Sequence, residues 1–307
     1  MSNEVKLDAF LPAEMAERAE NVGVRKAQLS FWNMFVLAIL AGAFIAMGAE
    51  FCTLVTTDSG LSFGLNKLVG GLAFSLGLIL VVVAGAELFT GNNLIIMAWV
   101  SGKLTLGQLM RNWVTVYFGN LVGSVLTAGL MYLTKQWTFS SYHVGVTALN
   151  TANAKASLGF PEALARGILC NVLVCLAVWL CFSGRSVVDK IFAIVFPITA
   201  FVASGFEHSI ANMYFIPIGL LLKGETAVLE AAGKTAADFA NLDLMGFLSN
   251  LVPVTIGNIF GGGFMVAAVY WFIYRRPQLT GRRYGPKQVV ELFLGPSGTP
   301  EAQKEQN

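Results

Sequence analysis

The sequence GFEHSIAN, at residues 205–212, matches GAELFTGN, at residues 85–92, in the pattern G-x-E-x4-N. Each match lies inside an apolar run of roughly 33 to 35 residues, at about 68–100 and 188–222. A hydrocarbon core of roughly 30 Å needs only about 20 helical residues, and tilting absorbs only part of such an excess. The two runs are therefore predicted to be membrane helices that break at the motif.

A second repeat supports an internal duplication. NWVTVYFGNLVG at residues 112–123 and NLVPVTIGNIFG at residues 250–261 share N-x6-G-N-x2-G, in the same order along the chain as the first pair. Four further apolar runs of spanning length occur at about 30–55, 108–134, 160–183 and 247–274. Three spans in each half is an odd number, so the second half starts from the opposite side of the membrane.

The predicted fold is an all-α integral membrane protein with six transmembrane helices, arranged as two inverted three-helix repeats with helices two and five broken. A channel domain at 29–275 would hold repeat one at about 29–134 and repeat two at about 160–275. Glycines spaced four apart, at Gly119 and Gly123 and at Gly257 and Gly261, let helices approach closely. Packing within one protomer is favoured over contact between subunits.

Composition excludes several classes of protein. Hydrophobic residues make up 55% of the 307 residues and charged residues only 12%, about half the charged share of a soluble domain. The net charge of +2 comes without a basic block, so nucleic acid is not an expected partner. The four cysteines match no metal-binding spacing, so buried small residues are expected, with no metal and no cofactor.

The basic residues orient the chain. With the N-terminus in the cytoplasm, 14 of the 20 lysines and arginines fall on the cytoplasmic side, which places both termini there. Residues 1–28 are predicted to be a cytoplasmic segment with a short helix over 8–23, starting near Pro12 and ending before Gly23. Residues 276–307 are predicted to be a flexible cytoplasmic tail. His143 is expected in an outer loop.

Few ionisable residues lie inside the predicted membrane region, and such residues usually mark function. Glu87 and Glu207 precede the two breaks, where each carboxylate is expected to accept hydrogen bonds from freed backbone N–H groups. Asn92 and Asn212 are expected to bind carbonyl groups or to cap the second half-helix. We interpret these four residues as scaffolding.

The two breaks differ where a pore needs chemistry. Leu88, Phe89 and Thr90 follow the first glutamate, whereas His208, Ser209 and Ile210 follow the second. His208 can change its charge near neutral pH, and Thr90 offers a hydroxyl from the opposite break. These two residues are the candidates for contact with a solute. Three apolar side chains upstream of the breaks, Phe74, Leu78 and Phe201, would form narrow rings if they faced the pore. Composition alone favours a position in the core or facing lipid.

Together with GNLVG, VPVTIGN and CNVLVCLAVW (residues 170–179), the breaks ELFTGN and GFEHSIAN resemble the formate/nitrite transporter family. The resemblance covers about residues 28–275, and LPAEMAERAENVGVRKA near the N-terminus is similar to the formate channel branch. It implies an aquaporin-like fold and a homopentamer with one pore in each protomer. It also implies passage of formate and related small monovalent anions across the bacterial inner membrane.

The same resemblance implies roles for individual residues. His208 would be the central pore histidine, with Thr90 as its hydrogen-bonding partner, and Leu88 and Phe89 would belong to the mobile loop of the first break. The remaining implied positions are a periplasmic constriction at Phe74 and Phe201, a cytoplasmic constriction at Leu78 and Val174, and polar positions near the pore at Asn171 and Asn258.

Three alternatives stay open to different degrees. A nitrite or hydrosulfide channel of the same family would share these features. A neutral-solute or water pore would have inverted halves too, but the paired Asn-Pro-Ala motif is absent from the sequence. An enzyme is not expected, because one histidine beside one glutamate supplies neither a nucleophile–base pair nor a metal cluster. Acid is expected to regulate the channel by ordering the N-terminal helix against the cytoplasmic mouth.

Overall fold

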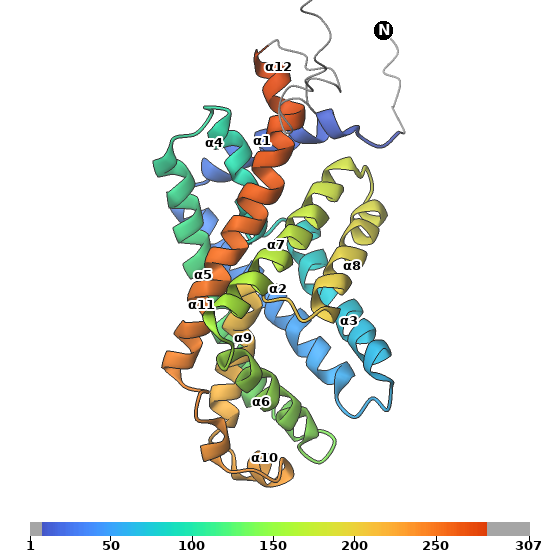
Figure 1. Ribbon diagram of the computed structural model, residues 1–307, viewed down its shortest axis with the longest axis vertical. Helices are drawn as coiled ribbons and strands as arrows, with labels where there is room; N and C mark the ends of the chain where they lie inside the picture. Colours follow the sequence, from blue (N-terminus) through green and yellow to red (C-terminus); the bar gives the residue numbers. More distant parts are fainter. Residues whose placement is uncertain (1–7, 281–307) are drawn as a thin grey trace, which may run out of the picture.

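The computed structural model describes residues 8–280, and within this range the chain is helical, with no β-strand. The helices form one elongated bundle, and the two described ends of the chain, in α1 and α12, lie at the same end of it (Figure 1). An even number of membrane crossings produces this arrangement.

The first half of the chain consists of α1 (Pro12–Ala27), α2 (Phe31–Thr56), α3 (Phe63–Ala84), η1 (Gly91–Ile95), α4 (Ile96–Val100) and α5 (Leu106–Leu133). The second half consists of η2 (Gln136–Thr138), α6 (His143–Ala156), α7 (Phe160–Ser183), α8 (Val187–Ala203), α9 (Ser209–Leu222), α10 (Thr226–Ala231), η3 (Ala236–Phe239), α11 (Leu244–Ile259), the π-helical η4 (Phe260–Ala268) and η5 (Trp271–Arg275), and α12 (Arg276–Thr280).

Both over-long apolar runs are broken, as predicted. The first ends as α3 at Ala84 and resumes at Gly91, and the second ends as α8 at Ala203 and resumes at Ser209. In the described part of the chain, five helical stretches are long and apolar enough to cross a membrane, and the sixth crossing is shared by α8 and the shorter α9. The six-span, twofold-repeated architecture is confirmed.

Close helix crossings within one protomer explain the repeated glycines. A Cβ atom on Gly123 would lie 2.0 Å from the carbonyl oxygen of Ile39, and one on Gly261 would lie 2.1 Å from that of Ile168. The first contact joins α5 to α2, and the second joins η4 to α7. The preferred reading of these glycines as packing inside a protomer is therefore confirmed.

Three expectations about local structure are corrected. The N-terminal helix starts at Pro12 but continues through Gly23 to Ala27, and Gly23 is buried against Ile95 and Ala98 rather than ending the helix. The segment between the two predicted repeats, expected to be an outer loop that holds His143, contains a helix, α6, whose first residue is His143. The predicted flexible tail is helical as far as Thr280, and its remaining residues lie outside the described residues.

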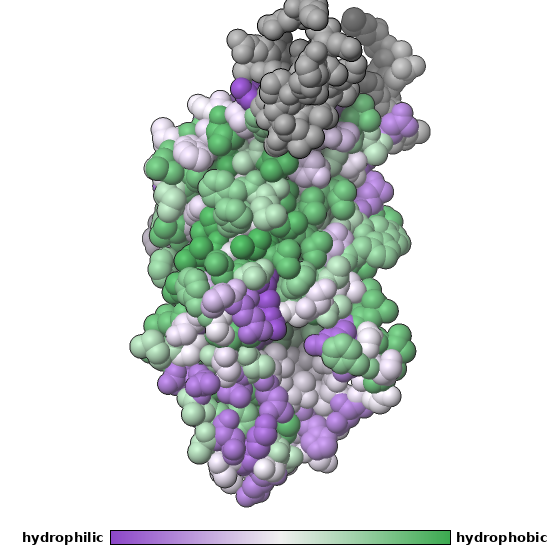
Figure 2. Space-filling view, viewed as in Figure 1, coloured by the Kyte–Doolittle hydropathy of each residue, from purple (hydrophilic) through white to green (hydrophobic). Residues whose placement is uncertain are grey.

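Large apolar side chains cover much of the outer surface. Trp32 is 71% exposed and Phe63 is 80% exposed, which a water-soluble protein of this size would avoid. Figure 2 shows apolar residues over the middle of the molecule and polar residues gathered towards the α6 and α10 end. This surface fits a lipid environment around the bundle.

Candidate permeation site

The two helix breaks begin with the same backbone conformation. Gly85 has φ +81° and directly follows the last residue of α3. Gly205 has φ +69° and lies two residues after the end of α8. Positive φ is the left-handed region, which glycine adopts without a steric penalty and which commonly ends helices. The shared glycine of the G-x-E motif therefore terminates each first half-helix.

Glu87 lies in the first break and is held by side chains. The Lys26 ammonium lies 2.8 Å from Glu87 Oε1, and Asn92 Nδ2 donates to Oε2 at 2.7 Å. Asn92 Nδ2 also donates to Asn112 Oδ1 at 2.9 Å, and Asn112 Nδ2 returns to the carbonyl oxygen of Lys26 at 3.3 Å. Four residues from α1, the break and α5 thus form one polar unit.

Glu207 has the same surroundings in the second break. Lys155 Nζ lies 2.8 Å from Glu207 Oε1, and Asn212 Nδ2 donates to Oε2 at 2.6 Å. Asn212 Nδ2 also donates to Asn250 Oδ1 at 2.7 Å, and Asn250 Nδ2 donates to the carbonyl oxygen of Lys155 at 2.9 Å. The two polar units match residue by residue, which makes α1 and α6 equivalent helices of the two halves.

The expected roles of these residues need correction. The two glutamates accept from lysine and asparagine side chains rather than from freed backbone N–H groups, and Asn92 and Asn212 bind those glutamates rather than cap a helix. Each buried carboxylate is matched by a lysine ammonium, which offsets the cost of burying its charge. Their scaffolding role itself stays a prediction that the geometry favours.

The freed backbone groups are instead bound by the asparagines of the repeated Gly-Asn pairs. Asn120 Oδ1 accepts from the N–H of Phe89 at 2.9 Å, and its Nδ2 donates to the carbonyl groups of Glu87 and Ala38. These contacts anchor the main chain of the first break to α2 and α5.

Asn258 makes the equivalent contacts in the second break. Its Oδ1 accepts from the N–H of Ser209 at 2.9 Å, and its Nδ2 donates to the carbonyl groups of Glu207 at 3.0 Å and Gly167 at 2.8 Å. Asn258 was expected to be a polar position near the pore. In the structure its side chain binds the main chain of the second break.

Sequence reasoning missed Lys26, Lys155, Asn112 and Asn250 as parts of the breaks. One signal was available, since K-A-x-L-x-F occurs at residues 26–31 and again at residues 155–160. The first asparagine of N-x6-G-N-x2-G was the second signal, because it is Asn112 in one half and Asn250 in the other.

His208 and Thr90 meet between the two breaks. His208 Nε2 lies 2.9 Å from Thr90 Oγ1, and both side chains are buried. His208 Nδ1 lies 3.1 Å from the backbone nitrogen of Ala211, whose N–H can only donate. Nδ1 is therefore the acceptor, so the ring is neutral with its proton on Nε2, and Nε2 donates to Thr90 Oγ1. The hydroxyl proton of Thr90 is then free to donate elsewhere.

Asn171 ties this pair to the surrounding helices. Its Nδ2 lies 3.2 Å from the carbonyl oxygen of Thr90 and 2.6 Å from that of Asn258. The thiol of Cys175 lies 3.3 Å from the same Thr90 oxygen. The backbone of Thr90 is therefore fixed from α7, and its side chain is directed at His208.

Two cavities approach the pair from opposite sides. The α6-side vestibule has a volume of about 320 Å³ and is lined by His208, Phe74, Phe201 and Lys155, among others. The Phe74 and Phe201 rings meet edge to face with centroids 5.6 Å apart, and the Phe201 ring stacks on His208 at 5.9 Å. The two phenylalanines thus stand beside the histidine at the inner end of this vestibule.

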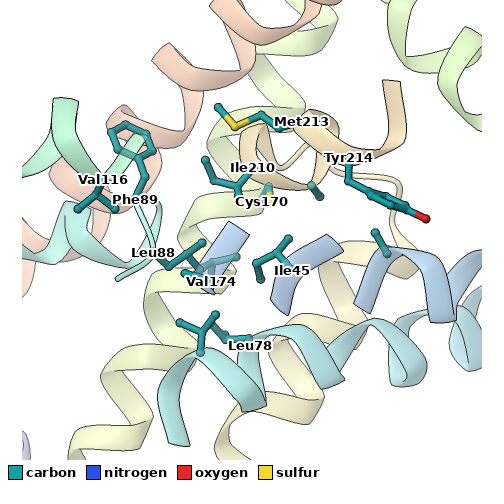
Figure 3. Packing of buried hydrophobic residues seen from close by; sticks show 14 of the residues in the cluster. Ile45, Leu78, Leu88, Phe89, Val116, Cys170, Val174, Ile210, Met213 and Tyr214 are labelled. Atoms are coloured by element: carbon teal, nitrogen blue, oxygen red, sulfur yellow. The ribbon is translucent and has the colours of Figure 1, made fainter. Parts of the chain in front are cut away.

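The α1-side vestibule has a volume of about 650 Å³, and its lining includes Leu78 and Leu88. Both leucines are buried, as is Val174 on α7, and the three side chains lie together in Figure 3. An apolar barrier therefore stands between this vestibule and the His208–Thr90 pair.

Phe89 does not line either vestibule. Its ring packs against Trp113 and Tyr117 of α5, with centroids 6.0 and 5.0 Å away, and Figure 3 shows it directed away from Leu88.

Within residues 8–280 no three histidine, cysteine or acidic side chains gather as metal ligands. The chemistry on offer at the centre is hydrogen bonding from one imidazole and one hydroxyl.

Comparison with known proteins fits this geometry. The family model for formate/nitrite transporters matches residues 13–272. The chain belongs to the formate/nitrite transporter family. It is 49% identical over 280 residues to the formate channel FocA of Escherichia coli (strain K12), covering 90% of this chain and 98% of the relative. It is 43% identical to formate channel FocA of Haemophilus influenzae, covering 84% and 92%.

Solved structures agree with these sequence matches. A pentameric formate channel with formate bound superposes with a TM-score of 0.75 at 45% identity, over 80% of this chain and 97% of that one. An FNT family ion channel gives a TM-score of 0.72 at 28% identity, over 84% and 98%. The chain is thus a membrane transport protein rather than an enzyme.

Proposed function

We propose that this protein is a channel for formate and related small monovalent anions. The observation that carries the proposal is the hydrogen bond from His208 to Thr90, which joins the two helix breaks between two opposed vestibules. The chain's similarity to formate channels supports formate as the anion.

The neutral histidine suits an anion that binds by hydrogen bonds. An anion entering between the two side chains would accept a hydrogen bond from His208 Nε2–H in place of Thr90 Oγ1. It would also accept a hydrogen bond from the hydroxyl group of Thr90. Since Nδ1 remains bonded to the Ala211 N–H, the ring keeps its orientation while the anion passes. Two convergent donors favour a small carboxylate over water.

The apolar side chains on either side of this pair restrict what can pass. A bare charge in an apolar constriction costs several kcal/mol, and the cost rises for each further charge. Leu78, Leu88 and Val174 face an anion on one side, and Phe74 and Phe201 face it on the other. Small, singly charged ions are therefore the class that these constrictions admit.

Lys155 supplies positive potential to the α6-side vestibule. Its ammonium lies 2.8 Å from Glu207 and its side chain is 15% exposed, so it meets an incoming anion while staying paired. The α6 side would be periplasmic, because the positive-inside rule puts both termini in the cytoplasm. A bacterial inner-membrane location and a homopentamer complete the proposal, in line with the pentameric relative.

Single-channel recording in a planar bilayer tests the proposal. Formate, nitrite, acetate, lactate and hydrosulfide are compared at equal concentration, and formate is expected to carry the largest current. A larger nitrite or hydrosulfide current would change the assigned substrate within the family. No current with any of these anions, together with high water permeability in stopped-flow measurements, would favour a neutral-solute pore and refute the proposal.

The histidine is tested by His208→Phe, which keeps an aromatic ring but removes the Nε2 donor. Formate flux into proteoliposomes at pH 7 should then fall, because the anion loses one of its two hydrogen-bond donors. Unchanged flux would remove His208 from the mechanism. Acid should act on the N-terminal helix by loosening it rather than by ordering it, because protonation of Glu20 removes its ion pair with Arg275.

A further inference from the structure

The α1-side vestibule is lined by many more basic than acidic side chains. Five basic side chains line it, contributed by α1, the turn after α7, and α8: Arg18, Arg25, Lys26, Arg185 and Lys190. Glu87 is the single acidic residue of the described lining, and it is paired with Lys26. Four cations of this wall therefore have no ion-pair partner among the described residues.

Two of these cations are held close to each other. The guanidinium carbons of Arg18 and Arg185 lie 3.7 and 3.9 Å from the centroid of the Phe10 ring, so they are no more than about 7.6 Å apart. Arg18 donates to the Phe182 carbonyl at 3.2 Å, and Arg185 donates to the Asp8 carbonyl. Each guanidinium carries five N–H donors, so most of them stay available for an anion.

The size of the cavity also exceeds what a formate ion needs. About 650 Å³ lies in the range of small-molecule sites, which is roughly 300–1,000 Å³. The α6-side vestibule has about half that volume, and its basic lining residues are Lys67 and Lys155, of which Lys155 is paired with Glu207. The excess of charge and space therefore belongs to one mouth of the pore.

We propose that the α1-side vestibule is a binding site for a small soluble molecule that carries two or more phosphate groups. Several fixed guanidinium and ammonium groups around a wide cavity match such a polyvalent anion. Leu78 and Leu88 close its inner end, so the molecule cannot continue along the path. The bound molecule would therefore block the α1-side mouth of the pore. This block rests on the proposed function, whereas binding of the molecule does not.

Binding is tested by calorimetry with pyrophosphate on the purified full-length protein in a zwitterionic detergent. The variants are Arg25→Gln on α1 and Lys190→Gln on α8, because neither side chain has a described hydrogen bond or ion pair. Each is expected to weaken binding about threefold and the pair about tenfold, since each cation acts through partly screened solvent. Lys234→Gln, which removes an exposed cation outside both vestibules, should leave binding unchanged.

Block is tested with formate flux in proteoliposomes made only of phosphatidylcholine. Pyrophosphate on the α1 side should reduce flux, and Arg25→Gln/Lys190→Gln should relieve the reduction. Flux that pyrophosphate leaves untouched would overturn the block while the proposed function stands. Absence of formate flux would instead refute the proposed function, and calorimetry would still decide the site. Binding that all three charge variants weaken equally, or that requires anionic lipid, would overturn the site.

Discussion

Lys26 and Lys155 lie at equivalent positions in the two halves, and each ammonium lies 2.8 Å from the glutamate of its own helix break. The two pairs differ in their access to solvent, since the side chain of Lys26 is 28% exposed and that of Lys155 is 15% exposed. The glutamates are 4% exposed in both cases. Each ion pair therefore supports a break. Because Lys155 is less exposed than Lys26, loss of the lysine should cost more stability in the second break than in the first.

Lys155→Met should destabilise the protein, because it leaves the Glu207 carboxylate buried without a cation. Loss of one partner of a buried pair typically costs about 3–5 kcal/mol. Thermal unfolding in detergent should show a clear loss, with a smaller one for Lys26→Met at the more exposed pair. Adding Glu207→Gln to Lys155→Met should recover much of the stability but not the anion flux. A stable single variant would contradict this account of the break.

Asn258→Ala should loosen the second break, because it leaves the N–H of Ser209 and the carbonyl groups of Glu207 and Gly167 without their partner. An unsatisfied buried polar group costs roughly 1–3 kcal/mol. The expected result is a lower unfolding temperature and faster hydrogen exchange around residue 209. The control is Asn241→Ala, which removes an exposed hydrogen bond to Ser157 and should have little effect. Equal unfolding temperatures for the two variants would contradict the prediction.

Gly123→Ala should disrupt the crossing of α2 and α5, since the added Cβ would lie 2.0 Å from the Ile39 carbonyl oxygen. Overpacking of this kind typically costs about 1–3 kcal/mol or more. Gly129→Ala on the same helix is a matched control, because a Cβ there meets nothing within 4 Å. The control is expected to be neutral or to gain up to about 1 kcal/mol from helix propensity. Purified yield and unfolding temperature distinguish the two variants. A Gly123→Ala protein that is as stable as Gly129→Ala, or more stable, would refute the packing argument.

Acid should release α1 from the end of the last span. Burial acts to raise the pKa of Glu20, but hydrogen bonds from Arg275, Lys103 and Ser101 outweigh it and hold that pKa below its usual value of 4.5. A lowered pKa in the folded state means that the contact stabilises α1 above the usual glutamate pKa and is lost as the pH falls through the lower value.

Hydrogen exchange of the α1 amides measures this release, with exchange times corrected for the intrinsic effect of pH. Protection should be high at pH 7 and should fall below about pH 4. Glu20→Gln should already be loosened at pH 7 and should change little on acidification, whereas Glu17→Gln, at an exposed position of the same helix, should behave like the unmodified protein. Protection that stays constant down to pH 3 would rule out Glu20 as the attachment.

The sequence was sufficient to predict the broken spans, because an apolar run of roughly 35 residues cannot cross the membrane as one straight helix. His208 and Thr90 were also predictable, since they are polar positions where the two repeats differ. In contrast, α6 carries asparagine, threonine and glycine in a short polar stretch that has no clear helical periodicity. Its position is fixed by tertiary contacts of Lys155 at its C-terminal end, and hydropathy does not report them.

The contacts of Asn120 and Asn258 were out of reach for a different reason. Both asparagines bind backbone groups of segments that are distant in sequence, and the repeated Gly-Asn pair gives no indication of which segment lies opposite. The family resemblance placed Phe89 with Leu88 in the mobile loop of the first break, yet consecutive residues of a short turn point in different directions, and the Phe89 ring packs against Tyr117.

Asn120 and Asn258 bind the main chain of residues 87–89 and 207–209, and this anchoring uses none of the side chains of Leu88, Thr90 and His208. Cargo preference is therefore separable from architecture in this protein. An engineer who wishes to retune the pore can rewrite those few side chains while the lysine, glutamate and asparagine frame continues to hold the bends. Natural divergence within such a scaffold has the same freedom, since one substitution at the centre alters the chemistry offered to the passing ion without rebuilding the bundle.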